Sequence, residues 1–199
     1  MIVRKILNLF LFITFTYIPI AITSFLLQTL TKDTESTKIE HERRIKEDAP
    51  QIKQAINKGY LPHFFPEELS KYYPQNSIYY PLSTLPNQDT YFCNEGYGLI
   101  KYTTDKLGFR NKNSIYKNID NPIFLVGDSF VHGACVEKEN IFSFQISSIL
   151  DRKTFNFGVS SNGPLEYIAT IKNVINPLKK LVTGKSDIIL FIFSNDNLK

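Results

Sequence analysis

Three short apolar runs, each followed by a polar turn, set the strongest limit on how this chain can fold. They span residues 123–126, 154–157 and 188–193, and segments 140–150 and 165–178, which have helical spacing, lie between them. Strands that are apolar at successive positions are typically buried on both faces of a sheet. Alternation of such strands with helices predicts a parallel sheet covered by helices on both faces. We therefore expect an α/β domain over residues 97–199.

The N-terminus carries a second strong signal. Residues 6–31 contain no charged side chain, and a helix of that length crosses a membrane even with Pro19 inside it. A cleaved signal peptide is the alternative, with Ala21-Ile22-Thr23 as its cleavage site. Because the apolar run continues past that point, we favour a single-pass transmembrane anchor over residues 1–31. Arg4 and Lys5 then orient the chain in the cytoplasmic (inner) membrane with its domain facing the periplasm or exterior.

Two further segments separate this anchor from the α/β domain. Residues 32–59 are rich in Glu, Lys and Arg and are expected to form a charged helical stalk that is interrupted at Pro50. Residues 60–96 combine five prolines with many Tyr and Phe side chains, which argues against a long helix or a central strand. We interpret these aromatic residues as apolar cover for the core; a platform for stacking sugars is the alternative.

Composition excludes several classes of function. The net charge of +4 is small and scattered, so we expect no nucleic acid partner. Two cysteines and three scattered histidines do not form a metal-ligand pattern, and no cofactor is expected. Cys93 and Cys135 are either buried thiols or a disulfide, and their spacing alone does not decide between these states.

Each predicted strand ends in residues suited to acyl chemistry. The first is followed by Gly127-Asp128-Ser129, the second by Gly158 and the third by Asn195-Asp196. The carboxyl ends of parallel strands form the binding edge of such a sheet. Ser129 is therefore a candidate nucleophile, and its own N–H, the Gly158 N–H and the Asn195 amide are candidate donors of an oxyanion hole.

The order GDSF, glycine, ND resembles the first three blocks of the SGNH, or GDSL, hydrolase family. The flanking stretches CNEGYGLIKYTTDKLGFRN, GACV and NGPLEYIATI resemble a membrane-anchored bacterial subgroup of that family. The resemblance implies a flavodoxin-like three-layer α/β/α fold and matches Ser129 to the nucleophile and Gly158 and Asn195 to the oxyanion donors. It gives Asp128 no role as the triad acid. It further implies action on the O-acyl groups of a cell-envelope carbohydrate and a Cys93–Cys135 disulfide.

The family's catalytic histidine has no counterpart here. It belongs to a late Asp-x-x-His motif, whereas this sequence contains only His41, His63 and His132. His132 follows Ser129 on the same predicted helix, but its side chain leans back along that helix and no orienting acid accompanies it. We expect His63 to be a surface or packing residue. The chain therefore resembles the front half of an SGNH domain, truncated after the third strand: a fragment of a longer enzyme or a degenerate protein.

Two functions from different classes follow. The first is a serine O-acyl ester hydrolase or O-acetyltransferase acting on an extracytoplasmic glycan. The second is a non-catalytic, membrane-tethered module that binds an acylated glycan or assembles with a partner. A flavodoxin-like electron carrier is disfavoured, because the GDSF turn lacks a Ser/Thr-rich phosphate loop.

Overall fold

The computed structural model describes Thr23 and residues 34–72 and 80–193, and the chain divides into two compact units, residues 1–47 and 48–199. The expected anchor over residues 1–31 lies outside the described residues, apart from Thr23. Among the helices of the described part, none is both long and apolar enough to span a membrane.

A three-stranded parallel sheet forms the centre of the second unit. It consists of β5 (Ile123–Gly127), β6 (Thr154–Gly158) and β8 (Asp187–Leu190), in the spatial order β6-β5-β8. Every residue of β5 and β6 is buried. The predicted α/β class and parallel sheet are therefore confirmed. The third strand ends at Leu190, three residues before the end expected from the sequence.

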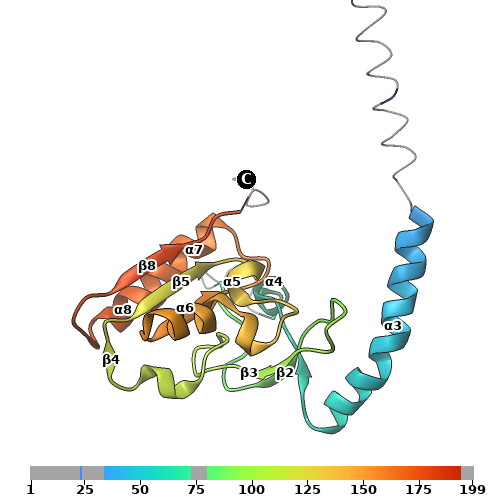
Figure 1. Ribbon diagram of the computed structural model, residues 1–199, viewed down its shortest axis with the longest axis horizontal. Coiled ribbons are helices and arrows are strands. Elements are labelled where there is room, and N and C mark those ends of the chain that lie inside the picture. Colours follow the sequence, from blue (N-terminus) through green and yellow to red (C-terminus); the bar gives the residue numbers. More distant parts are fainter. Residues whose placement is uncertain (1–22, 24–33, 73–79, 194–199) are drawn as a thin grey trace, which may run out of the picture. The chain divides into compact units, whose positions relative to one another are not determined.

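Helices cover both faces of this sheet (Figure 1). On one face lie α5 (Ser129–His132) and α6 (Phe142–Leu150), where Val131 and Ile146 pack on Ile123 and Leu125 of β5.

The opposite face carries α7 (Pro164–Thr170), a π-helical turn η4 (Ile171–Ile175) and α8 (Asn176–Lys179). These three follow one another without a break and occupy the segment in which a helix was predicted. Tyr167 and Ile175 pack there in the larger core cluster, with Phe and Val side chains of β5 and β6. The aromatic rings of β5 and β6 alternate toward this face because successive side chains of a strand point to opposite sides.

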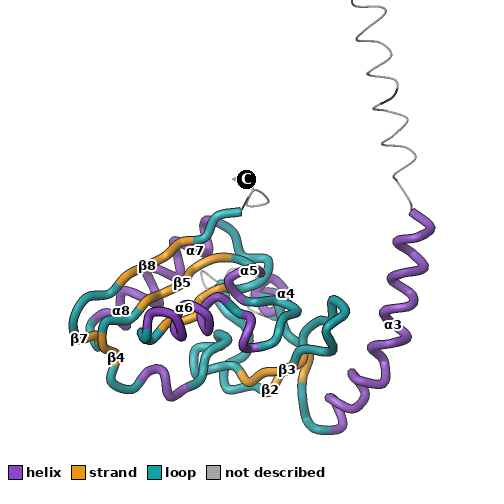
Figure 2. Tube along the Cα trace, viewed as in Figure 1, coloured by secondary structure: helices purple, strands orange, loops and turns teal. Residues whose placement is uncertain are grey.

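Two smaller sheets flank the central one. β1 (Leu61–Pro62) runs parallel to β2 (Asp89–Tyr91), which pairs antiparallel with β3 (Lys101–Thr103). β4 (Ile119–Asp120) and β7 (Val182–Thr183) form a parallel pair and lie side by side in Figure 2. Short helices complete the unit: α4 (Pro66–Ser70), η2 (Asn113–Tyr116) and η3 (Lys138–Asn140).

The structure corrects two expectations about residues 32–96. The expected absence of a central strand from residues 60–96 is wrong, because β2 is the middle strand of its sheet. The three residues of β2 contain no proline, so each can donate to the ladder.

The interruption of the stalk at Pro50 is also wrong, because α3 (Thr34–Asn57) continues through this residue. A proline removes one helical hydrogen bond, and contacts of the following turns can offset that loss. Here Gln51 accepts a hydrogen bond from the Leu99 N–H at 2.9 Å, and Ala55 is 1% exposed. The last turns of α3 therefore pack as part of the second unit.

Candidate functional site

Ser129 lies directly beyond the carboxyl end of β5, as the first residue of α5. Asp128 caps this helix: its Oδ1 accepts a hydrogen bond from the Phe130 N–H at 2.9 Å. A carboxylate at this position satisfies one of the N–H groups that a helix start leaves unpaired. Ser129 is half-buried, and no described residue forms a hydrogen bond with its hydroxyl or its N–H. Both groups are thus available to a ligand.

The two candidate glycines lie side by side at the ends of adjacent strands. Gly127 of β5 pairs in register with Gly158 of β6. The Gly158 N–H, however, already donates to Asn156 Oδ1 at 2.9 Å. It can therefore serve an oxyanion only if the Asn156 side chain releases it.

Packing gives a separate reason for glycine at position 158. A Cβ there would lie 2.2 Å from the His132 nitrogen and 2.5 Å from the Val131 carbonyl carbon. Both neighbours are backbone atoms of α5, which cannot rotate away as a side chain would. Gly158 therefore lets α5 approach β6 closely, whether or not it also donates to a ligand.

Asn156 is a site residue that the sequence analysis missed. It is fully buried in β6, and its amide donates to the Val131 carbonyl at 2.8 Å and to the His132 carbonyl at 3.4 Å. These bonds satisfy carbonyl groups at the end of α5, which a helix terminus otherwise leaves open. The available signal was an amide side chain inside the otherwise apolar run TFNFG, because a buried polar group requires partners.

The third candidate donor, Asn195, lies outside the described residues together with Asp196. The chain just before it is described. Phe193 stacks on Phe130 with ring centroids 4.1 Å apart. Phe130 follows Ser129 directly, so the segment that precedes Asn195 lies against the start of α5.

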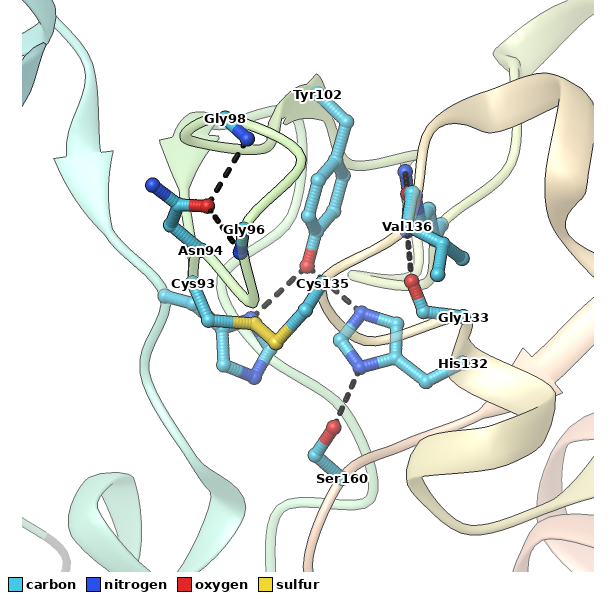
Figure 3. Close-up of a disulfide and its surroundings, with 12 residues drawn as sticks. Cys93, Asn94, Gly96, Gly98, Tyr102, His132, Gly133, Cys135, Val136 and Ser160 are labelled. Carbon is cyan, nitrogen blue, oxygen red and sulfur yellow. Dashed lines mark hydrogen bonds between the residues drawn. A yellow bond between two sulfur atoms is a disulfide. The ribbon is translucent and has the colours of Figure 1, made fainter. Parts of the chain in front are cut away.

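Two histidines meet in a buried cluster behind α5. The Tyr102 hydroxyl forms hydrogen bonds with His63 Nδ1 at 3.0 Å and with His132 Nε2 at 2.8 Å. His132 Nδ1 is bonded to the Ser160 hydroxyl at 2.8 Å (Figure 3). Both ring nitrogens of His132 therefore have partners other than Ser129. His63 packs on Phe92 with ring centroids 4.3 Å apart, which confirms its packing role.

The surroundings hold both histidines in their neutral form. Burial lowers the pKa of His63 from 6.5 to about 4, with Arg110 adding to the effect and Glu68 opposing it. Burial, assisted by the nearby His63 and Arg110, holds the pKa of His132 well below its usual range. Burial likewise raises the pKa of Tyr102, so its hydroxyl keeps its proton. The cluster is thus uncharged near neutral pH.

A disulfide and a buried arginine fix the loop that follows α5. Cys93 and Cys135 are bonded, with Cα atoms 5.0 Å apart (Figure 3). The Arg110 guanidinium donates to the Gly133 carbonyl and, at 2.9 Å, to the Val136 carbonyl. The pairing that the resemblance implied is therefore present, and it joins the segment after β2 to the end of α5.

The described residues contain no group of three or more His, Cys, Asp or Glu side chains arranged to hold a metal ion. Comparison of the chain with models of protein families, with curated proteins and with solved structures finds no match in any of the three.

Proposed function

We propose that Ser129 is the nucleophile of a serine O-acyl ester hydrolase or O-acetyltransferase that acts on an acylated glycan of the cell envelope. The observation that carries the proposal is the position of Ser129. Its hydroxyl and N–H lack hydrogen bonds to the described residues, and they lie at the carboxyl edge of a buried parallel sheet, next to Gly158. This edge is where doubly wound sheets bind ligands.

The strand order supports an SGNH-like, flavodoxin-like domain. Along the chain the strands of the central sheet come in the order β5, β6, β8, and their spatial order is second, first, third. Flavodoxin-like sheets begin with this 2-1-3 order, and their ligands bind at the switch point between the first and third strands. The stacking of Phe193 on Phe130 brings the end of the third strand toward Ser129, as an oxyanion role for Asn195 requires.

The proposed reaction needs a general base, and the contacts of His63 and His132 argue against either of them in that role. His63 and His132 hydrogen-bond to Tyr102 and Ser160, and their lowered pKa values follow from burial away from water. A serine hydroxyl becomes an effective nucleophile only when a base accepts its proton. The proposed enzyme therefore requires another group, a histidine or a carboxylate, to accept the Ser129 proton.

The proposed location outside the cytoplasmic membrane draws on the apolar run over residues 6–31 and on the disulfide. Structural disulfides persist in oxidising compartments and are rare in the cytosol. A chain anchored with its domain outside the membrane would reach envelope carbohydrates there.

A non-catalytic binding or assembly module is the second candidate. It is favoured by the hydrogen bonds that already occupy both ring nitrogens of His132 and the Gly158 N–H. Such a module would use the edge near Ser129 to hold an acylated glycan without cleaving it.

Labelling by a fluorophosphonate probe, read by intact mass, separates these two candidates. The hydrolase proposal predicts one adduct on the natural gene product, lost in Ser129→Ala and kept in Ser148→Ala, where an exposed serine on α6 is the matched control. Acyl-ester activity that survives in Ser129→Ala would overturn it. Binding of an acetylated glycan without labelling, unchanged by Ser129→Ala, would support the binding module instead.

A further inference from the structure

A cavity of about 520 Å³ lies between β3, the loop before η2, and α6. Its size falls within the range of small-molecule sites, which is about 300–1,000 Å³. Neither Ser129 nor Gly158 lines it. Lys153 and Thr154, at the start of β6, do line it, whereas Ser129 follows the end of the parallel strand β5. The cavity therefore lies at the end of the central sheet where its parallel strands begin, whereas Ser129 lies at the end where they finish.

Every charged side chain that lines this cavity is basic. Its lining includes five basic side chains and no carboxylate: Lys101, Arg110, Lys112, Lys138 and Lys153. Burial lowers the pKa of Arg110, and Glu137 and Glu139 act against this shift through space, but neither glutamate lines the cavity. Like charges gathered in a concave site attract anions and raise their local concentration.

Arg110 is the most constrained of these cations. It is 7% exposed, stacks on the Tyr102 ring at 4.6 Å, and has no ion pair with a described residue. Two hydrogen bonds join its guanidinium to the Gly133 and Val136 carbonyls. A guanidinium has five N–H donors, so three of them lack an acceptor among the described residues. A buried cation is stabilised by an anionic partner, and a ligand in the cavity would provide one.

Lys101 and Lys112 contribute ammonium groups that are free to move. Both residues are exposed, and no hydrogen bond or ion pair links either ammonium to a described residue. The remaining two cations are partly engaged. Lys153 donates to the carbonyls of residues 117 and 118, and Lys138 lies over the Phe144 ring.

The other lining groups suit an ester rather than a bare ion. Hydroxyl groups of Ser143 and Ser147 offer hydrogen bonds, while Ile141 and Phe144 add an apolar surface. A ligand with a charged head and an organic part would use both kinds of contact.

We propose that this cavity binds a phosphate ester, with its phosphate near Arg110, Lys101 and Lys112 and its organic part against Ile141 and Phe144. A phosphate monoester carries close to two negative charges at neutral pH and three strong acceptor oxygens. That charge and acceptor number match a lining of five cations better than a carboxylate does. Arginine also binds phosphate through paired N–H groups.

Calorimetric titration of the full chain in detergent tests this assignment. The ligands are glucose 1-phosphate, a short-chain phosphatidic acid, inorganic phosphate and glucuronate. We expect saturable binding of a phosphate ester, tighter than that of inorganic phosphate or glucuronate and weakened by added salt. Tighter binding of glucose 1-phosphate would indicate a soluble ester as the ligand, and tighter binding of the phosphatidic acid would indicate a lipid.

The variant for this titration is Lys101→Ala with Lys112→Ala, because neither ammonium supports the fold. Loss of two charge-assisted contacts should weaken binding of the phosphate ester about tenfold or more. The matched control is Lys179→Ala with Lys180→Ala, two exposed lysines of the α8 region that do not line the cavity. Any of three outcomes would overturn the proposal: no saturable binding of either ester, equal affinity for glucuronate, or an equal loss in the control.

Discussion

At the scale of single residues, the buried polar groups behind α5 bind one another. Tyr102 bridges His63 and His132, and Ser160 completes the chain of hydrogen bonds. A buried polar network of this kind is stable only while its members keep their partners and their neutral state. Its first consequence is therefore a dependence of stability on pH.

Acid is expected to destabilise the protein through these histidines. The pKa of His63 is about 4 in the folded chain and 6.5 in the unfolded chain, and burial also holds the pKa of His132 well below 6.5. Between these values the unfolded chain binds more protons, so the free energy of unfolding falls as pH drops below about 6.5. Going from pH 7 to pH 5 should cost about 2 kcal/mol through His63, measured by urea denaturation, and protonation of His132 acts in the same direction.

The variant His63→Phe should show a smaller pH dependence, because the contribution of His63 is gone while that of His132 and an aromatic ring at position 63 remain. His41→Gln is the control and should lose as much stability in acid as the wild type. Identical slopes for the wild type and His63→Phe would show that another group dominates the acid response.

In this region the sequence predicted the position of Ser129 but not the contacts among the two histidines and Tyr102. Ser129 was found because it follows an apolar strand in a short local pattern, and the structure puts it at the strand end as expected. The hydrogen bonds of Tyr102 with His132 and with His63 span 30 and 39 residues of sequence. No local pattern encodes such a contact, because it depends on how β3 and the segment after β1 pack against α5.

At the scale of elements, α5 is too short to be stable alone. It contains four residues, and isolated helices shorter than about 12 residues are marginal in water. Its position depends on the Asp128 cap, on Asn156 at its end, and on the disulfide that follows it. The orientation of Ser129 thus depends on the preceding residue, on β6 and on the segment that carries Cys93.

Loss of the disulfide should therefore destabilise the unit measurably. Cys93 and Cys135 are 42 residues apart, and closing a loop of that length stabilises the folded state by about 4 kcal/mol in the chain-entropy model. The double variant Cys93→Ser, Cys135→Ser should unfold at a lower urea concentration than the oxidised wild type, with a difference of about 2–4 kcal/mol.

Reduced wild-type protein provides the control for this measurement. It should match the double variant, and adding reductant to the variant should change nothing. Equal stability of the oxidised and reduced wild type would show that other contacts hold the loop after α5.

The strands β5 and β6 were predicted well from the sequence, because each is a short run of mostly apolar residues followed by a turn. The runs over residues 123–126 and 154–157 became β5 and β6 with at most one residue of difference at an end. Pro50 misled the prediction because a proline acts locally, whereas the hydrogen bond from Leu99 to Gln51 and the burial of Ala55 act from elsewhere in the fold.

At the scale of the whole sheet, the two outer strands, β6 and β8, differ in how their free sides are covered. The outer edge of β6 is covered, because the Asn111 side chain forms hydrogen bonds with the backbone N–H and carbonyl of Asn156. β8 pairs with β5 alone among the described strands, and three apolar side chains lie exposed along it or just beyond it: Ile189, Leu190 and Ile192.

An exposed apolar edge strand templates pairing with another chain, so β8 is expected to drive self-association. Leu190→Lys combined with Ile192→Lys should slow aggregation several-fold, because charged side chains on an edge oppose strand pairing. Light scattering of the full chain in detergent at increasing concentration measures the effect. Leu165→Lys, which removes an exposed apolar side chain from α7, is the matched control and should aggregate like the wild type. Equal slowing by the control would contradict this prediction and attribute aggregation to general surface apolarity.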